Sequence, residues 1–233
     1  MPHEQPAPSP SPTPIQADAT LAALAVSWAG ASRVFQRHNL DFCCHGQQTL
    51  AGACGKRGLD VQAVLDELHH EVRLPDPATA WGELPQSHLL AHLVDHYHAG
   101  HRRELPRLLA MAEKVERVHA AKPDCPQGLT GFLDDLLERL DLHMQKEERV
   151  LFPLLLAGES SPAGPIACMI QDHDEHGEDL AELRRLTDSF TPPAEACGTW
   201  RALYLGLAEF ERELMEHIHL ENHVLFPRAL RGH

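Results

Sequence analysis

His143-Met-Gln-Lys-Glu147-Glu-Arg-Val-Leu-Phe-Pro153 is repeated in outline by His217-Ile-His-Leu-Glu221-Asn-His-Val-Leu-Phe-Pro227, and both stretches follow the pattern H-x-x-x-E-x-x-V-L-F-P. Residues four apart in a helix lie on the same face, one turn above each other. Each stretch therefore predicts a helix that presents an imidazole and a carboxylate on one side. Two such pairs that face each other would form a metal site with room for two ions.

A further histidine precedes each stretch at a matching distance. His98 lies 45 residues before His143 (143 − 98), and His173 lies 44 residues before His217 (217 − 173). Each half of this region thus contains one histidine, a helical hairpin and then the His-x-x-x-Glu pair. Two hairpins related by a pseudo-two-fold axis would bring four histidines and two glutamates to one centre, as in helix bundles that hold paired irons.

The six candidate ligands fall within apolar stripes of the predicted helices, and these stripes also include Val150 and Ile170. A buried carboxylate without a partner costs several kcal/mol or changes its pKa strongly, and ligation of a metal ion removes that cost. A single histidine in such a stripe is more often a hydrogen-bonded core residue, but the duplicated set favours metal binding. The candidate ligands are His98, His143, Glu147, His173, His217 and Glu221.

The hydrophobic periodicity predicts an all-α protein. Residues 1–17 are expected to be a disordered Pro-rich tail, 18–74 a small helical domain, 75–86 a linker, and 87–233 an antiparallel four-helix bundle. Helices are expected at residues 20–35, 49–55 and 60–71 of the small domain, and at 87–119, 130–156, 165–189 and 195–229 of the bundle. Asp60 should cap its helix, Pro106 should kink or break the first long helix, and Pro153 should bend the end of the second.

The composition limits the classes of partner. With 34 acidic and 20 basic residues in 233, the formal charge is −14, which argues against a general grip on nucleic acid or on an anionic membrane. The apolar runs are far shorter than a membrane span, and the N-terminus does not have the pattern of a signal peptide. The chain is therefore expected in the cytoplasm, where its six cysteines would stay reduced.

The chemistry of the ligands narrows the choice of metal. Imidazoles and carboxylates without a thiolate suit iron, manganese or zinc. A structural zinc site would use four ligands, often cysteines, and would close the coordination sphere. Six ligands shared by two metals leave open positions, so we interpret the set as a site for two non-haem Fe ions. Glu147 and Glu221 would bridge the irons, two histidines would complete each one, and oxidation would favour an added oxo or hydroxo bridge.

Other polar residues carry weaker predictions. His101 and His176 each follow a candidate ligand by three residues and are candidates for a spare ligand or a supporting position. Glu116 and His119 share the face of His98 further along the helix, where a core or surface role is the simpler interpretation. Four histidines lie off the apolar stripes and are expected in solvent: His92, His96, His219 and His223.

Cys43 and Cys44 are the second chemical feature, in the sequence Asp41-Phe-Cys-Cys-His-Gly46. Adjacent cysteines rarely bond to each other, because the ring that results is strained. One interpretation is a pair of small buried apolar residues. The other is a reactive thiol pair for redox chemistry, metal transfer or nitrosothiol chemistry, and the sequence favours neither. Cys54 is a further candidate for this group.

Several motifs occur together along the chain. They are Asp-Phe-Cys-Cys at 41–44, Tyr-His at 97–98 followed by His-Arg-Arg-Glu-Leu-Pro, Lys-Val-Glu-Arg-Val-His-Ala from 114, His-Asp-Glu-His at 173–176, Thr-Pro-Pro-Ala-Glu-Ala-Cys from 191, and the two His-x-x-x-Glu stretches. In these motifs the chain resembles the iron–sulfur cluster repair di-iron proteins, also called repair-of-iron-centres proteins, over nearly its whole length after residue 20. His45 is a departure, since the resemblance leads us to expect glycine there.

The resemblance implies a hemerythrin-like bundle with a di-iron centre at the six candidate ligands, and an N-terminal domain that carries the cysteine pair. It implies a protein that helps to restore iron–sulfur clusters damaged by oxidative or nitrosative stress by donating iron. Its partners would be damaged or apo iron–sulfur proteins, with nitric oxide or O2 as small ligands. A homodimer is compatible with the resemblance.

Two other functions fit the same ligands. A hemerythrin-like protein could bind or sense O2 or NO, but the oxygen carriers resemble a site of five histidines and two carboxylates, and this chain offers four histidines. A di-iron NO reductase would be an enzyme, and no electron-transfer motif in the sequence supports one. The more open site and the cysteine-bearing domain favour iron donation.

Overall fold

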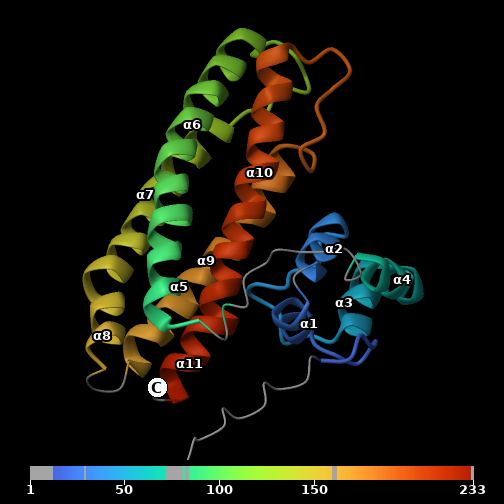
Figure 1. Cartoon of the computed structure of the whole chain (residues 1–233). Coiled ribbons are helices and arrows are strands. Elements are labelled where there is room, and N and C mark those ends of the chain that lie inside the picture. Colours follow the sequence, from blue (N-terminus) through green and yellow to red (C-terminus); the bar gives the residue numbers. More distant parts are fainter. Residues whose placement is uncertain (1–12, 29, 72–80, 82–83, 159–161, 232–233) are drawn as a thin grey trace, which may run out of the picture. The chain divides into compact units, whose positions relative to one another are not determined.

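The structure of the chain is a computed structural model that describes residues 13–28, 30–71, 81, 84–158 and 162–231. The chain forms two compact units, residues 1–79 and residues 80–233. Within the described residues the regular structure is helical apart from one isolated β-bridge between Thr20 and Thr49, so the predicted all-α fold is confirmed (Figure 1). Most of the predicted tail and linker, at 1–12, 75–80 and 82–83, lies outside the described residues, as do residues 72–74 at the end of the predicted small domain.

The first unit contains four short helices: α1 (Leu21–Ser27), α2 (Ala31–Arg37), α3 (Leu50–Arg57) and α4 (Val61–Glu71). The side chains of Thr20 and Thr49 accept backbone N–H hydrogen bonds and cap α1 and α3. Asp60 accepts a hydrogen bond from the backbone N–H of Gln62 at the start of α4, which confirms it as the cap. The helices enclose a small core that includes Leu24, Val34, Phe35, Phe42, Leu50, Val64 and Leu68.

The single helix predicted at 20–35 is wrong, because the structure has two helices there. Trp28 takes an extended backbone conformation (φ −138°, ψ 100°) that ends α1, and Gly30 precedes α2. A Cβ atom at residue 30 would lie 2.8 Å from Glu71 Cγ, so the turn brings this backbone close to the end of α4. The apolar periodicity cannot show the break, since it continues through both helices.

The second unit is built from four long helical segments. The first consists of α5 (Gln86–His92), the π-helical η1 (Leu93–His98) and α6 (Ala99–His119), and the second of α7 (Leu129–Lys146), the π-helical η2 (Glu147–Leu151) and α8 (Phe152–Ala157). The third is α9 (Ala163–Leu186), and the fourth consists of α10 (Gly198–Leu220), the π-helical η3 (Glu221–Leu225) and α11 (Phe226–Arg231). Helix α6 packs against α7 and α10, and α7 also packs against α9, which forms the predicted bundle (Figure 1).

The three π-helical segments lie beside candidate ligands and were beyond the reach of the apolar periodicity. His98 ends η1, Glu147 begins η2 and Glu221 begins η3. A π turn closes its hydrogen bond one residue later than an α turn, so it moves the residues that follow around the helix axis. Val150, predicted in the apolar stripe, is therefore 52% exposed, and Leu151 is buried in its place.

One further prediction about the long helices is wrong. Ile170 is 41% exposed, because the buried stripe of α9 passes through Met169. Of the kink or break predicted at Pro106, the break is not observed, because α6 continues through this residue, and the kink stays a prediction. Pro106 lies on the exposed side of the helix, where solvent can reach the carbonyl that loses its partner. Pro153 is the second residue of α8, which continues the helical segment directly from η2, and the bend expected there stays a prediction.

The core of the bundle near the candidate ligands is made of residues from all four segments. Its members include Leu89, Leu93, Tyr97, Leu151, Phe152, Ile166, Met169, Leu225 and Phe226. None of the helices within the described residues combines the length and the apolar character that crossing a membrane requires.

Leu151→Ala and Val150→Ala test the π-helical register of η2. Leu151 is fully buried, so its truncation should lower the free energy of unfolding by about 2–5 kcal/mol. Val150 is exposed, so its truncation should change that free energy by less than about 0.5 kcal/mol. Urea denaturation of both variants, followed by circular dichroism, measures the two values. A larger loss of unfolding free energy in Val150→Ala than in Leu151→Ala would show that an uninterrupted α-helix runs through residues 147–151.

Candidate dimetal centre

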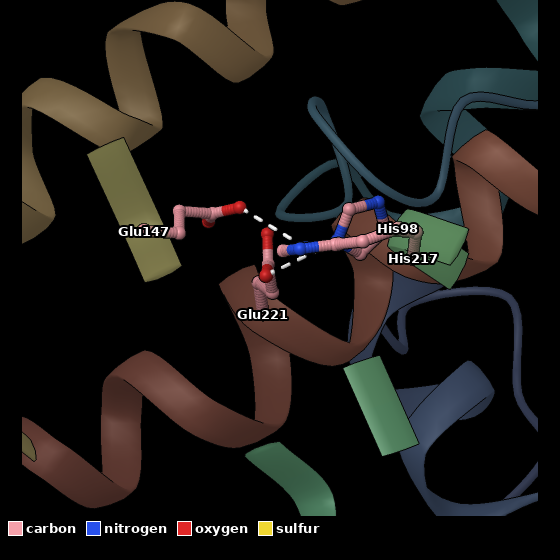
Figure 2. Close-up of side chains that lie close together, drawn as sticks. All are labelled: His98, Glu147, His217 and Glu221. Carbon is pink, nitrogen blue, oxygen red and sulfur yellow. Dashed lines mark hydrogen bonds and ion pairs between the residues drawn. The ribbon is translucent and has the colours of Figure 1, made fainter. Parts of the chain in front are cut away.

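One half of the centre joins two histidines from different helical segments. His98, at the end of η1, and His217, near the end of α10, bring their Nε2 atoms to 3.2 Å from each other. Glu147 and Glu221 approach the same point from η2 and η3, as Figure 2 shows. All four side chains are fully buried, and their ligand atoms lie within 4.8 Å of one another.

The other half has the same composition. His143 of α7 and His173 of α9 bring their Nε2 atoms to 3.2 Å from each other. The ligand atoms of this pair and of the same two carboxylates again lie within 4.8 Å of one another. The structure therefore brings all six predicted ligands together, with the two glutamates common to both halves.

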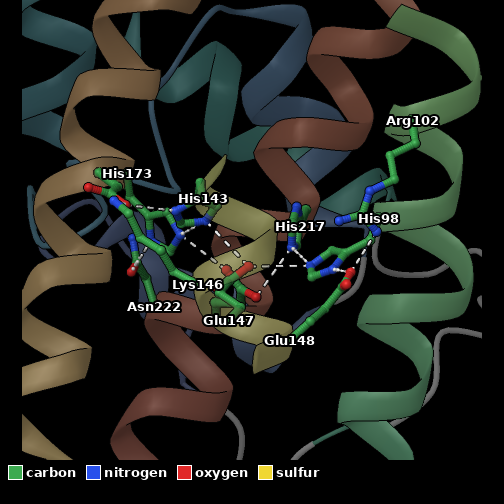
Figure 3. Close-up of polar contacts among 11 residues, drawn as sticks. His98, Arg102, His143, Lys146, Glu147, Glu148, His173, His217 and Asn222 are labelled. Atoms are coloured by element: carbon green, nitrogen blue, oxygen red, sulfur yellow. Dashed lines mark hydrogen bonds and ion pairs between the residues drawn. The ribbon is translucent and has the colours of Figure 1, made fainter. Parts of the chain in front are cut away.

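Glu147 lies between the two halves. Its Oε2 atom is 3.3 Å from His98 Nε2 and 3.4 Å from His143 Nε2, and Figure 3 shows it between the two groups of histidines. One carboxylate oxygen thus faces a histidine of each half.

Glu221 divides its two oxygens between the halves. Its Oε1 atom lies 3.2 Å from His217 Nε2, and its Oε2 atom lies 3.1 Å from His173 Nε2. A carboxylate in this position can give one oxygen to each of two cations, which is the arrangement of a bridging ligand.

The spacing and the unsatisfied atoms fit metal ions. Two nitrogens bound at about 2.0–2.1 Å to one ion lie roughly 2.8–3.0 Å apart in octahedral geometry and roughly 3.3–3.4 Å apart in tetrahedral geometry. The separation of both Nε2 pairs, 3.2 Å, lies between these ranges. Oε1 of Glu147 is buried without a hydrogen-bond partner, and the Oε2 atoms of Glu147 and Glu221 lie 3.1–3.4 Å from histidine Nε2 atoms without forming a hydrogen bond of good geometry. Buried polar atoms without partners are costly, and cations would satisfy them. The donor set therefore fits two cations of the kind that prefers nitrogen and oxygen.

The two buried carboxyl groups have opposite electrostatic surroundings. Burial and the nearby Glu221 carboxylate raise the pKa of Glu147 well above its ordinary value. Burial also opposes ionisation of Glu221, but the interactions with His217 and His173 outweigh it and lower the pKa of Glu221. Two carboxylates this close cannot both be ionised at low cost without positive charge between them.

Three of the four histidines are held by a partner on Nδ1. The pairs, with the distance between the two atoms, are His98 with Glu148 Oε1 (2.8 Å), His143 with Asp172 Oδ2 (3.2 Å) and His173 with Asn222 Oδ1 (2.8 Å) (Figure 3). Such contacts orient the ring, direct the Nε2 lone pair toward a metal and raise its basicity. Glu148 and Asn222 each follow a candidate bridging glutamate directly, a signal that the sequence analysis missed.

Cations on the surface of the bundle support two of these partners. Arg102 donates a hydrogen bond to Glu148 (2.6 Å), and Lys146 donates one to Asp172 (2.7 Å). The hydrogen bonds from His143 and Lys146 hold the pKa of Asp172 below its ordinary range. Burial lowers the pKa of His143 to about 3 even though Asp172 opposes this, so the imidazole is neutral and able to bind a metal at pH 7.

The duplicated Leu-Phe-Pro tails also belong to the centre. Phe152 stacks on the His98 ring with centroids 5.7 Å apart, and Phe226 stacks on the His173 ring with centroids 5.8 Å apart. Each stretch therefore uses its phenylalanine to pack the histidine of the preceding segment. This contact explains why the repeat extends beyond the ligands.

His101 and His176 lie beside the centre but outside both ligand groups. Each is 3% exposed, and their rings lie 5.3 Å from that of His217 and 5.1 Å from that of His143, respectively. His219, expected in solvent, is 4% exposed, so that prediction is wrong. Near its end α10 is covered on several sides, and a single apolar stripe does not describe it.

Glu116 and His119 have structural roles away from the centre. Glu116 accepts a hydrogen bond from the backbone N–H of Thr130 at the start of α7, and His119 Nε2 lies 3.3 Å from Cys197 Sγ. Glu116 follows His98 by 18 residues (116 − 98), which corresponds to roughly 27 Å along a helix. They therefore hold together a part of the bundle remote from the ligands.

In the first unit, Cys43 and Cys44 form a group with Asp41. The two sulfurs are 3.5 Å apart, well beyond the roughly 2.05 Å of a disulfide bond. Asp41 Oδ1 accepts hydrogen bonds from Cys43 Sγ (3.3 Å) and Cys44 N (2.9 Å), and Oδ2 lies 2.6 Å from His45 Nδ1. The ligand atoms of Asp41, Cys43 and Cys44 lie within 4.8 Å of one another, so a cation could bind them, and Cys54 does not join this group.

The two thiols of this group differ. Cys43 is fully buried, whereas Cys44 is partly exposed. The hydrogen bond with Cys44 and burial raise the pKa of Cys43 well above its ordinary value. Cys43 thus resembles a packing residue, and Cys44 is the member of the pair that a partner could reach.

Comparison with known proteins agrees with this geometry. Residues 89–229 match the model of the hemerythrin HHE cation binding domain, which covers all six candidate ligands. The chain belongs to the hemerythrin HHE family. Residues 17–72 match a second family, a domain of unknown function called DUF542, so the cysteine pair lies in a domain separate from the HHE domain.

Relatives of the HHE protein extend the match to nearly the whole chain. The proteins named iron-sulfur cluster repair protein YtfE from Yersinia pseudotuberculosis serotype IB (strain PB1/+) and from Yersinia pestis (strain Pestoides F) are each 49% identical to it over 214 residues. The match covers 91% of this chain and 97% of each relative. The resemblance to the iron–sulfur cluster repair family is therefore confirmed.

Glu147→Gln tests the electrostatic cost of the centre in the metal-free HHE protein. Because the pKa of Glu147 is raised above the ordinary value of 4.5, the unfolded chain loses this proton first as the pH rises. Folding of the wild type then weakens by up to about 1.4 kcal/mol per pH unit, and glutamine avoids this loss. We expect the variant to be more stable at pH 7, with a difference that disappears toward pH 4.5. Urea denaturation between these pH values measures it, and a variant that is less stable throughout would contradict the assignment.

Proposed function

We propose that this protein holds two iron ions and donates iron to iron–sulfur clusters damaged by oxidative or nitrosative stress. The observation that supports this most strongly is the buried centre with two carboxylates common to two pairs of histidines. The HHE family is a cation-binding family, and relatives that match this chain nearly end to end are named for iron–sulfur cluster repair.

The geometry assigns the six candidate ligands to two iron positions. His98 and His217 would hold one iron, His143 and His173 the other, and the two glutamates would bridge them. Bound iron would supply reversible redox chemistry and exchangeable coordination positions. Since imidazole and carboxylate are harder ligands than the cysteine thiolates that iron–sulfur proteins offer, transfer of iron from this site to such a protein is chemically favoured.

Two histidines beside the centre favour a second candidate function, the binding or sensing of NO or O2. The Nε2 atoms of His101 and His176 are buried and have no hydrogen-bond partner. His176 Nδ1 lies 3.4 Å from Asp179 Oδ2, which supports the tautomer with its Nε2 lone pair directed inward. These atoms could interact with a small ligand at the centre, and reduction of NO would be an enzymatic extension of the same property.

Iron content tests the first part of the proposal. Anaerobically purified protein should contain two irons per chain, with spectroscopic evidence of coupling between them. Glu221→Ala should weaken the coupling, because each carboxylate would bridge both irons, whereas Glu104→Ala, at an exposed ion pair on α6, should leave iron content unchanged. One tightly held zinc per chain with no uptake of iron would contradict a di-iron centre.

Iron donation is tested by anaerobic mixing of the iron-loaded protein with an apo iron–sulfur protein and sulfide. The expected result is cluster absorbance at the rate and to the extent that the donor loses iron. Addition of NO or O2 without an acceptor gives the comparison for gas binding. Spectral changes with the gas but no cluster formation with the acceptor would favour the second candidate function.

We further propose that Cys43 and Cys44 act in iron transfer and not in assembly of the centre. Two observations support this. The Cys44 thiol is partly exposed, and the ligand atoms of Asp41, Cys43 and Cys44 lie close enough together to bind one cation. All six candidate ligands lie in the other compact unit. The pair would therefore be needed after iron loading.

Cys43→Ser/Cys44→Ser should keep two irons per chain and slow cluster repair, as measured in the same mixing experiment. Cys168→Ser, at an exposed cysteine of the bundle, is the matched control and should change neither value. Equal repair rates for the double variant and the wild type would limit the pair to packing. Loss of the folded first unit would show that the buried Cys43 belongs to its core.

A further inference from the structure

The two halves of the centre correspond residue by residue. The corresponding pairs are His98 with His173, His143 with His217, Glu147 with Glu221, Glu148 with Asn222, and Phe152 with Phe226. Both members of a pair play the same part, as a ligand, as the hydrogen-bond acceptor of a histidine ligand, or as the ring stacked on one. A position at which the correspondence fails would make the two halves unequal.

The correspondence fails at the residue that precedes His98 in one half and His173 in the other. Asp172 precedes His173, and its Oδ2 atom lies 3.2 Å from the Nδ1 atom of His143. The equivalent residue is Tyr97, which precedes His98. It stacks on the ring of His217, with centroids 5.3 Å apart and planes 6° apart. A stacked ring cannot accept the hydrogen bond that the carboxylate accepts.

His217 is accordingly the one candidate ligand whose Nδ1 atom is buried without a hydrogen-bond partner in the described structure. The other three have a carboxylate or an amide oxygen at 2.8–3.2 Å. Stacking on Tyr97 keeps the ring in its plane but does not fix its rotation within that plane. The carboxylate on His143 does fix it and also raises the basicity of Nε2.

We infer that the two irons of the centre are unequal, that the one on His98 and His217 is held more weakly and leaves first, and that Tyr97 sets this difference. The inference rests on the proposed di-iron function. Loss of a hydrogen-bonded partner of a histidine ligand typically lowers metal affinity by about 10–100-fold. Each chain would then donate one iron readily and keep the second on His143 and His173. Asp172, the hydrogen-bond partner of His143, is itself held by Lys146.

Release of iron to a ferrous chelator under anaerobic conditions tests the inference on the full-length, iron-loaded protein. The wild type should lose its irons in two phases of one iron each, with rates that differ by about 10–100-fold. Tyr97→Asp supplies the missing acceptor and should slow the fast phase toward the slow one. Tyr97→Phe keeps the stacked ring and should leave both phases unchanged.

Two variants assign the phases to the halves. Asp172→Ala removes the partner of His143 and should speed up the slow phase by about tenfold or more. Glu148→Gln weakens the partner of His98 and should speed up the fast phase alone. If Tyr97→Asp does not fold, Asp172→Ala decides the question through the slow phase.

Release of both irons in a single phase from the wild type would overturn the inference and leave the two-iron centre intact. An unchanged slow phase in Asp172→Ala would also overturn it. A protein that never binds two irons would overturn both the inference and the proposed function, and iron analysis before the chelator is added separates these cases.

Discussion

Glu147 and Glu221 are buried against each other in the middle of a helical bundle, and this pair of carboxylates is the constraint on which the rest of the second unit depends. The side chains that surround them within ligand distance include four imidazoles. Burial of two neighbouring carboxylates lowers the stability of the fold when no cation is bound. It becomes favourable when cations lie between the carboxylates, so the folded bundle is prepared for a charge that the chain does not carry itself.

The layers around the carboxylates follow from this constraint. A histidine that binds a metal must direct a lone pair inward, and carboxylate and amide groups hold the outer nitrogens of three of the four in that orientation. The phenylalanines of the duplicated tails close the apolar wall behind two of the rings. Arg102 and Lys146 lie further out, where they support Glu148 and Asp172 and remain accessible to solvent. These two cations therefore contact the acceptors of the histidine ligands and not the candidate ligands themselves.

The predictable part of this arrangement was the part that recurs in the sequence. The His-x-x-x-Glu spacing occurs twice with the same tail, so the ligand candidates and the four long helices could be recognised without structural information. Residues that hold a ligand from another helix were harder to predict from the sequence. Asp172 holds His143 from another helix, and nothing in the local pattern of either residue announces this contact.

Local departures from regular geometry were also missed. The chain breaks between α1 and α2 at Trp28, with Gly30 close to the end of α4, and the exposure of Val150 depends on a π turn. An apolar pattern averages over several turns and assumes a constant number of residues in each, so it cannot register a single turn of different size. The burial of His219 was not predicted for a related reason, since the apolar pattern assumes that only one side of a helix is covered.

The π turns have a consequence for how the chain can change its length. Removal of one residue between Glu147 and Leu151 would not shorten a flexible connection. It would convert the π turn into an ordinary α turn, and because a π turn holds about one residue more than an α turn, the residues beyond it would keep nearly the same direction around the helix axis. Phe152 of α8 would therefore stay on the side of His98. The π turn thus absorbs one residue locally, so loss of one residue should be tolerated in η2 better than in the regular turns of α7, where it would rotate everything beyond it by about 100°.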